Sequence, residues 1–200
     1  EPLPEKPVVI TFDDGYLSNY TLAYPILQKY NMKATIFVIG VSFGKDHYKD
    51  TGYAMTPHFG AAEAKEMTDS GLISIQSHTY DMHQWPPYED GSAAVRENIL
   101  PLAGESEEAY VRALTEDFTK SRAQLEDATG QPVDVLAYPA GQYSTLAQVT
   151  LQGLGVHVTL STNPGVNTVV KGLPQTLYAM LRFGITDDIT PAALLALIGA

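Results

Sequence analysis

Short hydrophobic runs alternate along the chain with longer segments that have helical spacing. Runs rich in β-branched and other apolar residues predict strands at 8–12, 34–39, 72–76, 133–138 and 156–160, with a sixth at 177–183. The segments between and after these runs predict helices at 17–30, 58–70, 106–128, 146–154 and 191–198. Because buried strands joined by helices are typical of parallel sheets, the pattern predicts an α/β fold.

Spacing and breaker residues define the faces and ends of the first two helices. Leu22, Ile26 and Leu27 share one face of the first helix, which we expect to be buried. Pro57 suits the first turn of the second helix, and Gly71 suits its end.

The chain length restricts the architecture. No repeat, low-complexity segment or linker divides the 200 residues, so we expect a single domain over 1–200. Periodicity alone does not distinguish an open, doubly wound sheet from a closed barrel. An eight-unit barrel needs about 250 residues, so a barrel of this length has to be smaller or irregular.

Composition excludes several classes of protein. The absence of cysteine excludes disulfide scaffolds, iron–sulfur clusters and thiol catalysis. A net charge of −11 argues against a nucleic-acid partner, and no apolar run reaches the roughly 20 residues of a membrane-spanning helix. The chain begins at Glu1, with Pro2 and Pro4 close behind, which we interpret as a cut end with any signal or anchor upstream. We expect a monomer.

Polar residues are concentrated where the predicted strands end. The first strand runs into Asp13 and Asp14, the third is followed by His78 and His83, and the sixth carries Arg182. Active sites of parallel α/β proteins lie at the carboxyl ends of the strands. These residues are therefore candidates for a shared site, although an Asp-Asp-Gly string is also an ordinary turn.

The two histidines after the third strand are five residues apart, so they share no helical face and need a loop that turns back. Two imidazoles and one carboxylate form the open-sided set found in hydrolytic zinc and non-haem iron sites. The alternative is a pair of structural histidines. Of the others, we expect His47 to be solvated and His157 to lie in the core, whereas His58 could line the cleft.

Two strings together resemble the polysaccharide deacetylases of carbohydrate esterase family 4, the NodB homology domain. Residues 11–16, Thr-Phe-Asp-Asp-Gly-Tyr, match the first motif of that family, and residues 77–83, Ser-His-Thr-Tyr-Asp-Met-His, match the second with one extra residue. In having that extra residue, the second motif resembles the branch of the family that deacetylates poly-N-acetylglucosamine. The resemblance covers nearly the whole chain.

The resemblance implies a distorted, incomplete (β/α) barrel with about seven parallel strands. It implies Asp13 as general base and Asp14, His78 and His83 as ligands of a divalent metal. Zinc is the usual ion, with cobalt, nickel or iron as alternatives. It further implies an N-acetylated glycan as substrate, Tyr16 at the substrate site, and an extracytoplasmic location.

The chain departs from the family in its later motifs. The third motif keeps Pro139 and Gly141, but Ala137 stands in place of the arginine and Ala140 in place of the aromatic residue. The backbone N–H of Ala140 can still supply an oxyanion donor. The late motif with a histidine acid is absent, since no histidine follows His157.

One hypothesis follows from the missing arginine. Arg182 replaces it by pairing with Asp13 from another strand, or else forms a structural salt bridge. Trp85, close after His83, either stacks on a sugar ring or packs the proline-rich loop of 84–104.

Three other readings of the function remain open at this point. The altered motifs could mark a glycan-binding module without turnover. A glycosidase could use two carboxylates such as Asp13 and Asp81. Within the family, the substrate could be a different amide, such as peptidoglycan or a small cyclic amide.

Overall fold

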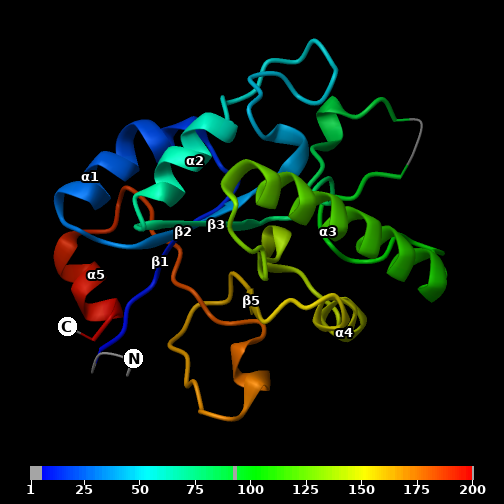
Figure 1. Ribbon diagram of the computed structural model, residues 1–200. Coiled ribbons are helices and arrows are strands. Elements are labelled where there is room, and N and C mark those ends of the chain that lie inside the picture. The colour runs from blue at the N-terminus through cyan, green and yellow to red at the C-terminus, as the bar shows by residue number, and fades with distance from the viewer. Residues whose placement is uncertain (1–5, 92–93, 200) are drawn as a thin grey trace.

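Five parallel strands form the central sheet, and their order in space is their order in the chain. The computed structural model describes residues 6–91 and 94–199, so Glu1, Pro2 and Pro4 lie outside the described residues. The strands are β1 (Ile10–Phe12), β2 (Ala34–Val38), β3 (Ile73–Ser77), β4 (Val135–Ala137) and β5 (Val158–Leu160). Each pairs in parallel with the next. In a (β/α) barrel the strands follow one another around the sheet in chain order, as they do here, whereas in a doubly wound sheet the order reverses. The sheet is a half-barrel (Figure 1). The predicted fold class is therefore confirmed.

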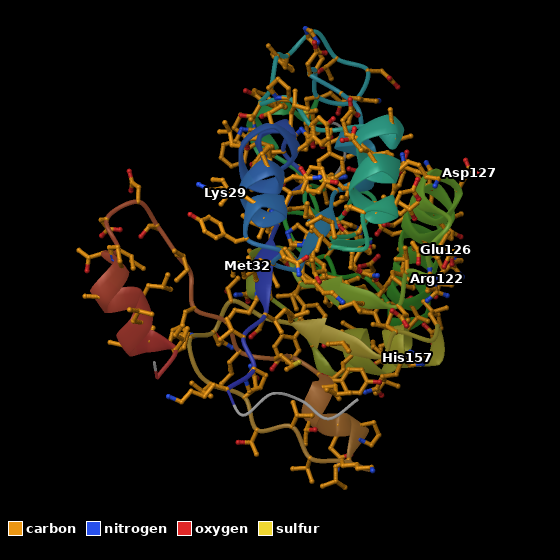
Figure 2. The ribbon with its side chains drawn as sticks, turned by 60° about the vertical axis from the view of Figure 1, so that its left-hand side comes forward. Lys29, Met32, Arg122, Glu126, Asp127 and His157 are labelled. Carbon is orange, nitrogen blue, oxygen red and sulfur yellow. The ribbon has the colours of Figure 1, made fainter. Side chains whose placement is uncertain are left out.

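The α-helices are α1 (Tyr24–Lys29), α2 (Ala61–Asp69), α3 (Glu107–Thr129), α4 (Thr145–Gly153) and α5 (Pro191–Leu197). Helices α1 to α4 pack on the outer face of this half-barrel, whereas α5 buries none of its residues and stands apart in Figure 2. Shorter helical segments are a π-helix at Asn19–Ala23 and 3-10 turns at Gly40–Ser42, Pro86–Tyr88, Pro139–Gly141 and Pro174–Leu177. Among the described residues, no helix is both long and apolar enough to cross a membrane.

Alternation along the strands divides the core into layers. Ile36 and Val38 of β2 belong to a cluster with α1 and α2, whereas Phe37 between them packs with Ala137 and Leu160 inside the half-barrel. The period of two directs successive side chains to opposite faces of the sheet. A further cluster between α3, α4 and β4 completes the core.

The longest helix, α3, matches its predicted position at 106–128. Ser106 caps it by accepting the N–H of Ala109 at 3.2 Å, and Gly130 ends it in the left-handed conformation. Near its carboxyl end, Arg122 Nε donates to the Val133 carbonyl, and Val133 N–H donates to Glu126 Oε1, both at 3.0 Å. These two side chains, labelled in Figure 2, anchor the segment that enters β4.

The predicted sixth strand at 177–183 is absent, and the described sheet has five strands rather than about seven. Ala179 adopts φ 52°, which interrupts an extended run. Only Met180 forms a bridge, to Leu160 of β5. The chain still passes beside β5, so Arg182 reaches the sheet without lying in a strand.

The first predicted helix has a different buried face. Leu27 is buried, but Leu22 is 66% exposed and Ile26 is 58% exposed. The segment begins as a π-helix, whose wider turn rotates the face relative to 3.6-residue spacing.

The second helix begins later than predicted. The Pro57 carbonyl accepts the N–H of Leu17, and Phe59 N–H donates to the Gly15 carbonyl, so these residues pair with the turn after β1. The helix therefore starts at Ala61.

His157 is not a core residue. Its side chain is 72% exposed at the start of β5, where Nδ1 lies 3.2 Å from Asp134 Oδ2 (Figure 2). His47 is exposed, as predicted.

Candidate active site

Three residues that are not glycine adopt left-handed backbone conformations where strands end. They are Asp14 after β1 (φ 70°), Thr79 after β3 (φ 71°) and Ala140 after β4 (φ 53°). Such conformations each cost of the order of 1 kcal/mol or more and cluster at functional sites. Their positions mark the carboxyl end of the half-barrel as the candidate site.

The turn after β1 presents two adjacent carboxylates. Gly15 N–H donates to the Asp13 carbonyl at 3.0 Å, and Ile39 N–H donates to the Asp14 carbonyl at 3.3 Å. Gly15 has φ 84°, and a Cβ there would lie 3.1 Å from Val38 Cγ2. Glycine thus lets the turn pack closely against β2.

Asp14, His78 and His83 come together as a possible metal site. One ligand atom from each lies within 4.8 Å of the others. His78 Nε2 is 3.5 Å from Asp14 Oδ1, and His83 Nε2 is 3.8 Å from the same oxygen. The three residues that the family resemblance implies as ligands therefore converge.

The other ring nitrogens show which way the imidazoles are oriented. His78 Nδ1 is 2.8 Å from the Ala137 carbonyl, and His83 Nδ1 is 3.2 Å from the Glu97 carbonyl. Because a carbonyl only accepts, Nδ1 carries the proton in each ring. The lone pairs of both Nε2 atoms are then free to face Asp14, an arrangement typical of metal-binding histidines.

The electrostatics of this cluster fit a cation. Asp14 Oδ1 is buried and has no hydrogen-bond partner, and two nitrogen lone pairs face it. Burial lowers the pKa of His78 and outweighs the opposing charges of Asp13 and Asp14. The ring is thus neutral near pH 7, which is the form that binds a metal. A cation would satisfy all three acceptors.

Asp13 points to a different partner. Arg182 Nη1 donates to Asp13 Oδ1 and Nη2 donates to Oδ2, both at 2.8 Å. This is the paired geometry in which guanidinium and carboxylate match best. The arginine side chain is only 14% exposed. The predicted contact between Arg182 and Asp13 is therefore present.

Arg182 also connects the two edges of the half-barrel. Its Nε donates to the Ser161 carbonyl just after β5 at 2.9 Å, and Nη1 also donates to Thr11 Oγ1 of β1 at 3.2 Å. The guanidinium thus spans the gap between the first and last strands and holds Asp13 from the far side.

The pKa of Asp13 reflects a balance of opposing effects. Burial by itself raises the pKa, but the hydrogen bonds from Arg182 and the charges of His78, Arg182 and His83 outweigh it. The pKa is lowered below the ordinary 3.8. Asp13 is therefore ionised at neutral pH and can accept a proton.

Tyr16 and His58 lie beside the metal-binding cluster. Their rings are 4.9 Å apart, and the two residues form an antiparallel bridge. Burial, together with the charge of Asp14, raises the pKa of Tyr16 to about 12. His58 is buried, and burial lowers its pKa. Both residues thus stay neutral beside Asp14.

The remaining candidates lie further along the strand ends. Pro139 and Gly141 are buried, and Ala140 is exposed at the tip of the turn after β4. Trp85 is 58% exposed, and its backbone N–H donates to Tyr48 Oη at 3.2 Å. Trp85 is thus a surface side chain rather than packing for its loop.

Two charged residues near the site, Asp117 and Lys49, were not predicted from the sequence. Asp117 of α3 accepts backbone N–H groups from the loop between the two ligand histidines, and Lys49 pairs with Asp81 of that loop at 2.9 Å. Asp117 had a detectable signal, because a carboxylate three residues after Leu114 falls on the buried stripe of its helix. Lys49 had none.

Known proteins provide an independent comparison. The family model described as "Polysaccharide deacetylase" matches residues 1–159. The chain belongs to this family.

Named relatives agree with that assignment. The chain is 32% identical over 189 residues to YxkH of Bacillus subtilis (strain 168), covering 94% of this chain and 55% of that protein. It is 30% identical over 138 residues to the poly-beta-1,6-N-acetyl-D-glucosamine N-deacetylase of Staphylococcus aureus (strain MRSA252), covering 69% and 41% respectively. The chain thus spans about half the length, or less, of the curated relatives it matches.

A solved structure supports the fold over nearly the whole chain. IcaB from Ammonifex degensii superposes with a TM-score of 0.76 at 28% identity, covering 99% of this chain and 75% of that one.

Proposed function

We propose that this chain is the catalytic domain of a divalent-metal-dependent deacetylase that removes N-acetyl groups from an N-acetylglucosamine polysaccharide. The observation that carries the proposal is that a set of metal ligands and an ionised carboxylate meet at the carboxyl end of the half-barrel. Asp14, His78 and His83 form a set of three ligands that leaves coordination positions open for water and substrate. The adjacent Asp13 is held ionised by Arg182. Relatives whose printed name is poly-beta-1,6-N-acetyl-D-glucosamine N-deacetylase support the substrate class.

Asp14, His78 and His83 would hold the metal. When bound, it supplies a Lewis acid that polarises the acetyl carbonyl and acidifies water. Two nitrogens and one oxygen with open positions suit zinc, and cobalt, nickel or iron accept the same donors.

The protein's own groups then handle protons and charge. Asp13 accepts a proton from the attacking water, while Arg182 fixes the direction of its carboxylate. The backbone N–H of Ala140 donates to the oxyanion that forms as water adds to the carbonyl carbon. The C–N bond then breaks as Asp13 passes the proton it took from water to the leaving amine, and acetate and a free amino sugar leave. Tyr16, Trp85 and the turn from Pro139 to Gly141 bind the glycan.

The location belongs to the same proposal. Biofilm and cell-wall glycans lie outside the cytoplasm, so we place the reaction there. The net charge of −11 suits a protein whose product gains positive charge.

The competing readings receive less support. A two-carboxylate glycosidase needs a protonated acid, but the pKa of Asp13 is lowered and Asp81 pairs with Lys49. A binding module has no chemical need for a carboxylate held in register by an arginine.

Acetate release tests the proposal. β-1,6-Linked N-acetylglucosamine oligomers, with chitin oligomers and peptidoglycan fragments in parallel, are incubated with the protein before and after chelation. We expect metal-dependent release, fastest from the β-1,6-linked oligomer, and none from His78→Ala. Release that survives complete chelation, or no release from any glycan, would contradict the proposal.

A further inference from the structure

We propose that Asp117 of α3 is a positioning residue for the metal site: its carboxylate holds the loop between His78 and His83 and so sets where His83 lies. The inference rests on the metal site proposed above and extends it to a helix that contributes no ligand.

The loop poses a geometric problem. His78 lies at the end of β3, and His83 must return to the same point after four intervening residues. Thr79 takes a left-handed conformation at the start of this reversal, and no helix or strand stabilises residues 79–82. One hydrogen bond lies within the loop, from Met82 N–H to Thr79 Oγ1 at 3.2 Å, and the other backbone contacts described below come from outside it.

Asp117 supplies two of these contacts from 36 and 37 residues away. Its Oδ1 accepts the N–H of Tyr80 at 2.8 Å, and its Oδ2 accepts the N–H of Asp81 at 2.6 Å. Both carboxylate oxygens are thus used on adjacent N–H groups. Bonds to an ionised acceptor are shorter and stronger than neutral ones.

The loop carbonyls are fixed from the opposite side. Gly40 N–H donates to the Thr79 carbonyl at 3.0 Å, and Val41 N–H donates to the Tyr80 carbonyl at 2.9 Å. The Tyr80 peptide groups are therefore held between the turn after β2 and Asp117. Without the two bonds from Asp117, the loop would be free to rotate about the bonds that Gly40 and Val41 make to its carbonyls.

Side-chain contacts strengthen the outer part of the loop but do not replace this anchor. Lys49 Nζ lies 2.9 Å from Asp81 Oδ1, and Lys120 Nζ lies 3.9 Å from the centre of the Tyr80 ring. Both act on side chains, whereas Asp117 acts on the backbone that determines where His83 can reach.

The surroundings of Asp117 make a substitution informative. A cavity of about 280 Å³ borders it, lined also by Asp81, Met82, Gln84, Arg96, Ala113, Glu116 and Lys120. An asparagine fits without crowding. It offers one acceptor oxygen, and its amide N–H₂ has to face the other loop N–H, which leaves that group unpaired. Glu116, next in sequence and on the same cavity, makes no hydrogen bond to the loop and is the matched control.

Cobalt binding is the test. Co²⁺ alone is titrated into metal-free wild type, Asp117→Asn and Glu116→Gln, with affinity and the visible absorption bands as readouts. Groups that orient metal ligands typically contribute 10–100-fold in affinity. We expect Asp117→Asn to bind Co²⁺ about 10–100-fold more weakly, with altered bands, and Glu116→Gln to match the wild type.

Amide exchange in the metal-free wild type covers the case in which the variant does not fold. We expect slow exchange at Tyr80 and Asp81. Wild-type affinity and bands in a folded Asp117→Asn, or rapid exchange at both amides, would overturn the inference and leave the metal site intact. A wild type that binds no Co²⁺ would overturn the metal site and this inference together.

Discussion

β2 and β3 pair along five registered residues, whereas β3 and β4 share a single registered pair, Ser77 with Leu136. The first half of the sheet, from β1 to β3, carries both complete motifs, residues 11–16 and 77–83. In the second half, β4 and β5 share three registered pairs, and the stretch that follows is joined to β5 by one bridge at Met180. The two halves thus differ in how firmly the backbone is held.

The site uses this difference. All three candidate metal ligands follow strands of the firmly paired half, and Asp117 adds a further anchor to their loop. The partner of Asp13, Arg182, comes from the loosely paired half. It lies outside any strand and is held by a backbone bond from its N–H to the Asn163 carbonyl at 2.9 Å and by its side-chain bonds. Metal binding and proton transfer should therefore respond separately to mutation.

The sharpest separation is expected from Asp13→Asn. The amide cannot accept a proton from water, so the acetate-release rate should fall by about 10²–10⁴-fold. The three ligands are untouched, so Co²⁺ affinity should stay within a few-fold of the wild type. If Asp13→Asn released acetate at nearly the wild-type rate, the assignment of Asp13 as the general base would be wrong.

A smaller loss is expected from Arg182→Ala. Without the guanidinium the carboxylate is free to rotate, and activity should fall by about 10–100-fold, the range for groups that orient a reacting group. The pKa of Asp13 should rise, since Arg182 is among the groups that lower it. The acid limb of the kcat/KM profile should then move to higher pH. Arg112→Ala, on the exposed face of α3, is the control and should change neither quantity. An unchanged pH profile in Arg182→Ala would contradict the positioning role.

Gly141→Ala tests the loosely paired half through stability. A Cβ there would lie 2.1 Å from Thr162 Oγ1 and 2.7 Å from Thr162 N, at φ 69°. We expect a loss of about 1–3 kcal/mol in the free energy of unfolding, measured by urea denaturation. Gly153→Ala in α4 meets no atom within 4 Å and should be neutral or stabilising. Equal stability of the two variants would show that the turn after β4 adapts freely.

An effect of similar size is expected in the firmly paired half when the pH is changed. Burial raises the pKa of Asp117 from 3.8 to about 6, with Asp81 adding to the rise and Arg96 and the loop N–H groups opposing it. A raised carboxyl pKa contributes stability that is present below pH 3.8 and is lost as pH rises through about 6. The wild type should therefore gain about 1–3 kcal/mol relative to Asp117→Asn between pH 7.5 and pH 4.5.

The histidines whose pKa is lowered by burial, His58 and His78, titrate in both proteins and cancel in this difference. The lowered pKa of Asp13 acts below pH 3.8, outside the window. A stability difference that does not change with pH, measured by urea denaturation at both values, would contradict the raised pKa.

Local sequence predicted what depends on strand ends and missed what depends on tertiary packing. Asp13, Asp14 and His78 directly follow strands, so parallel pairing alone brings them together. The predicted contact between Arg182 and Asp13 is present although the strand predicted at 177–183 is absent, because the chain still passes beside β5.

The errors have separate physical causes. Ala179 breaks the sixth strand, and the π-helix before α1 turns the expected apolar face outward. Helical spacing puts Asp117 on the buried face of α3, but the packing of α3 against the loop, which brings its carboxylate to Tyr80 and Asp81, is a tertiary feature that spacing does not specify.

Anomalous scattering from a crystal soaked in Zn²⁺, recorded at the zinc edge, tests the central claim most directly. We expect one strong peak about 2.0–2.2 Å from Asp14, His78 Nε2 and His83 Nε2. A fully soaked crystal with no peak among these three residues, or with the zinc bound elsewhere, would contradict the metal site on which the account rests.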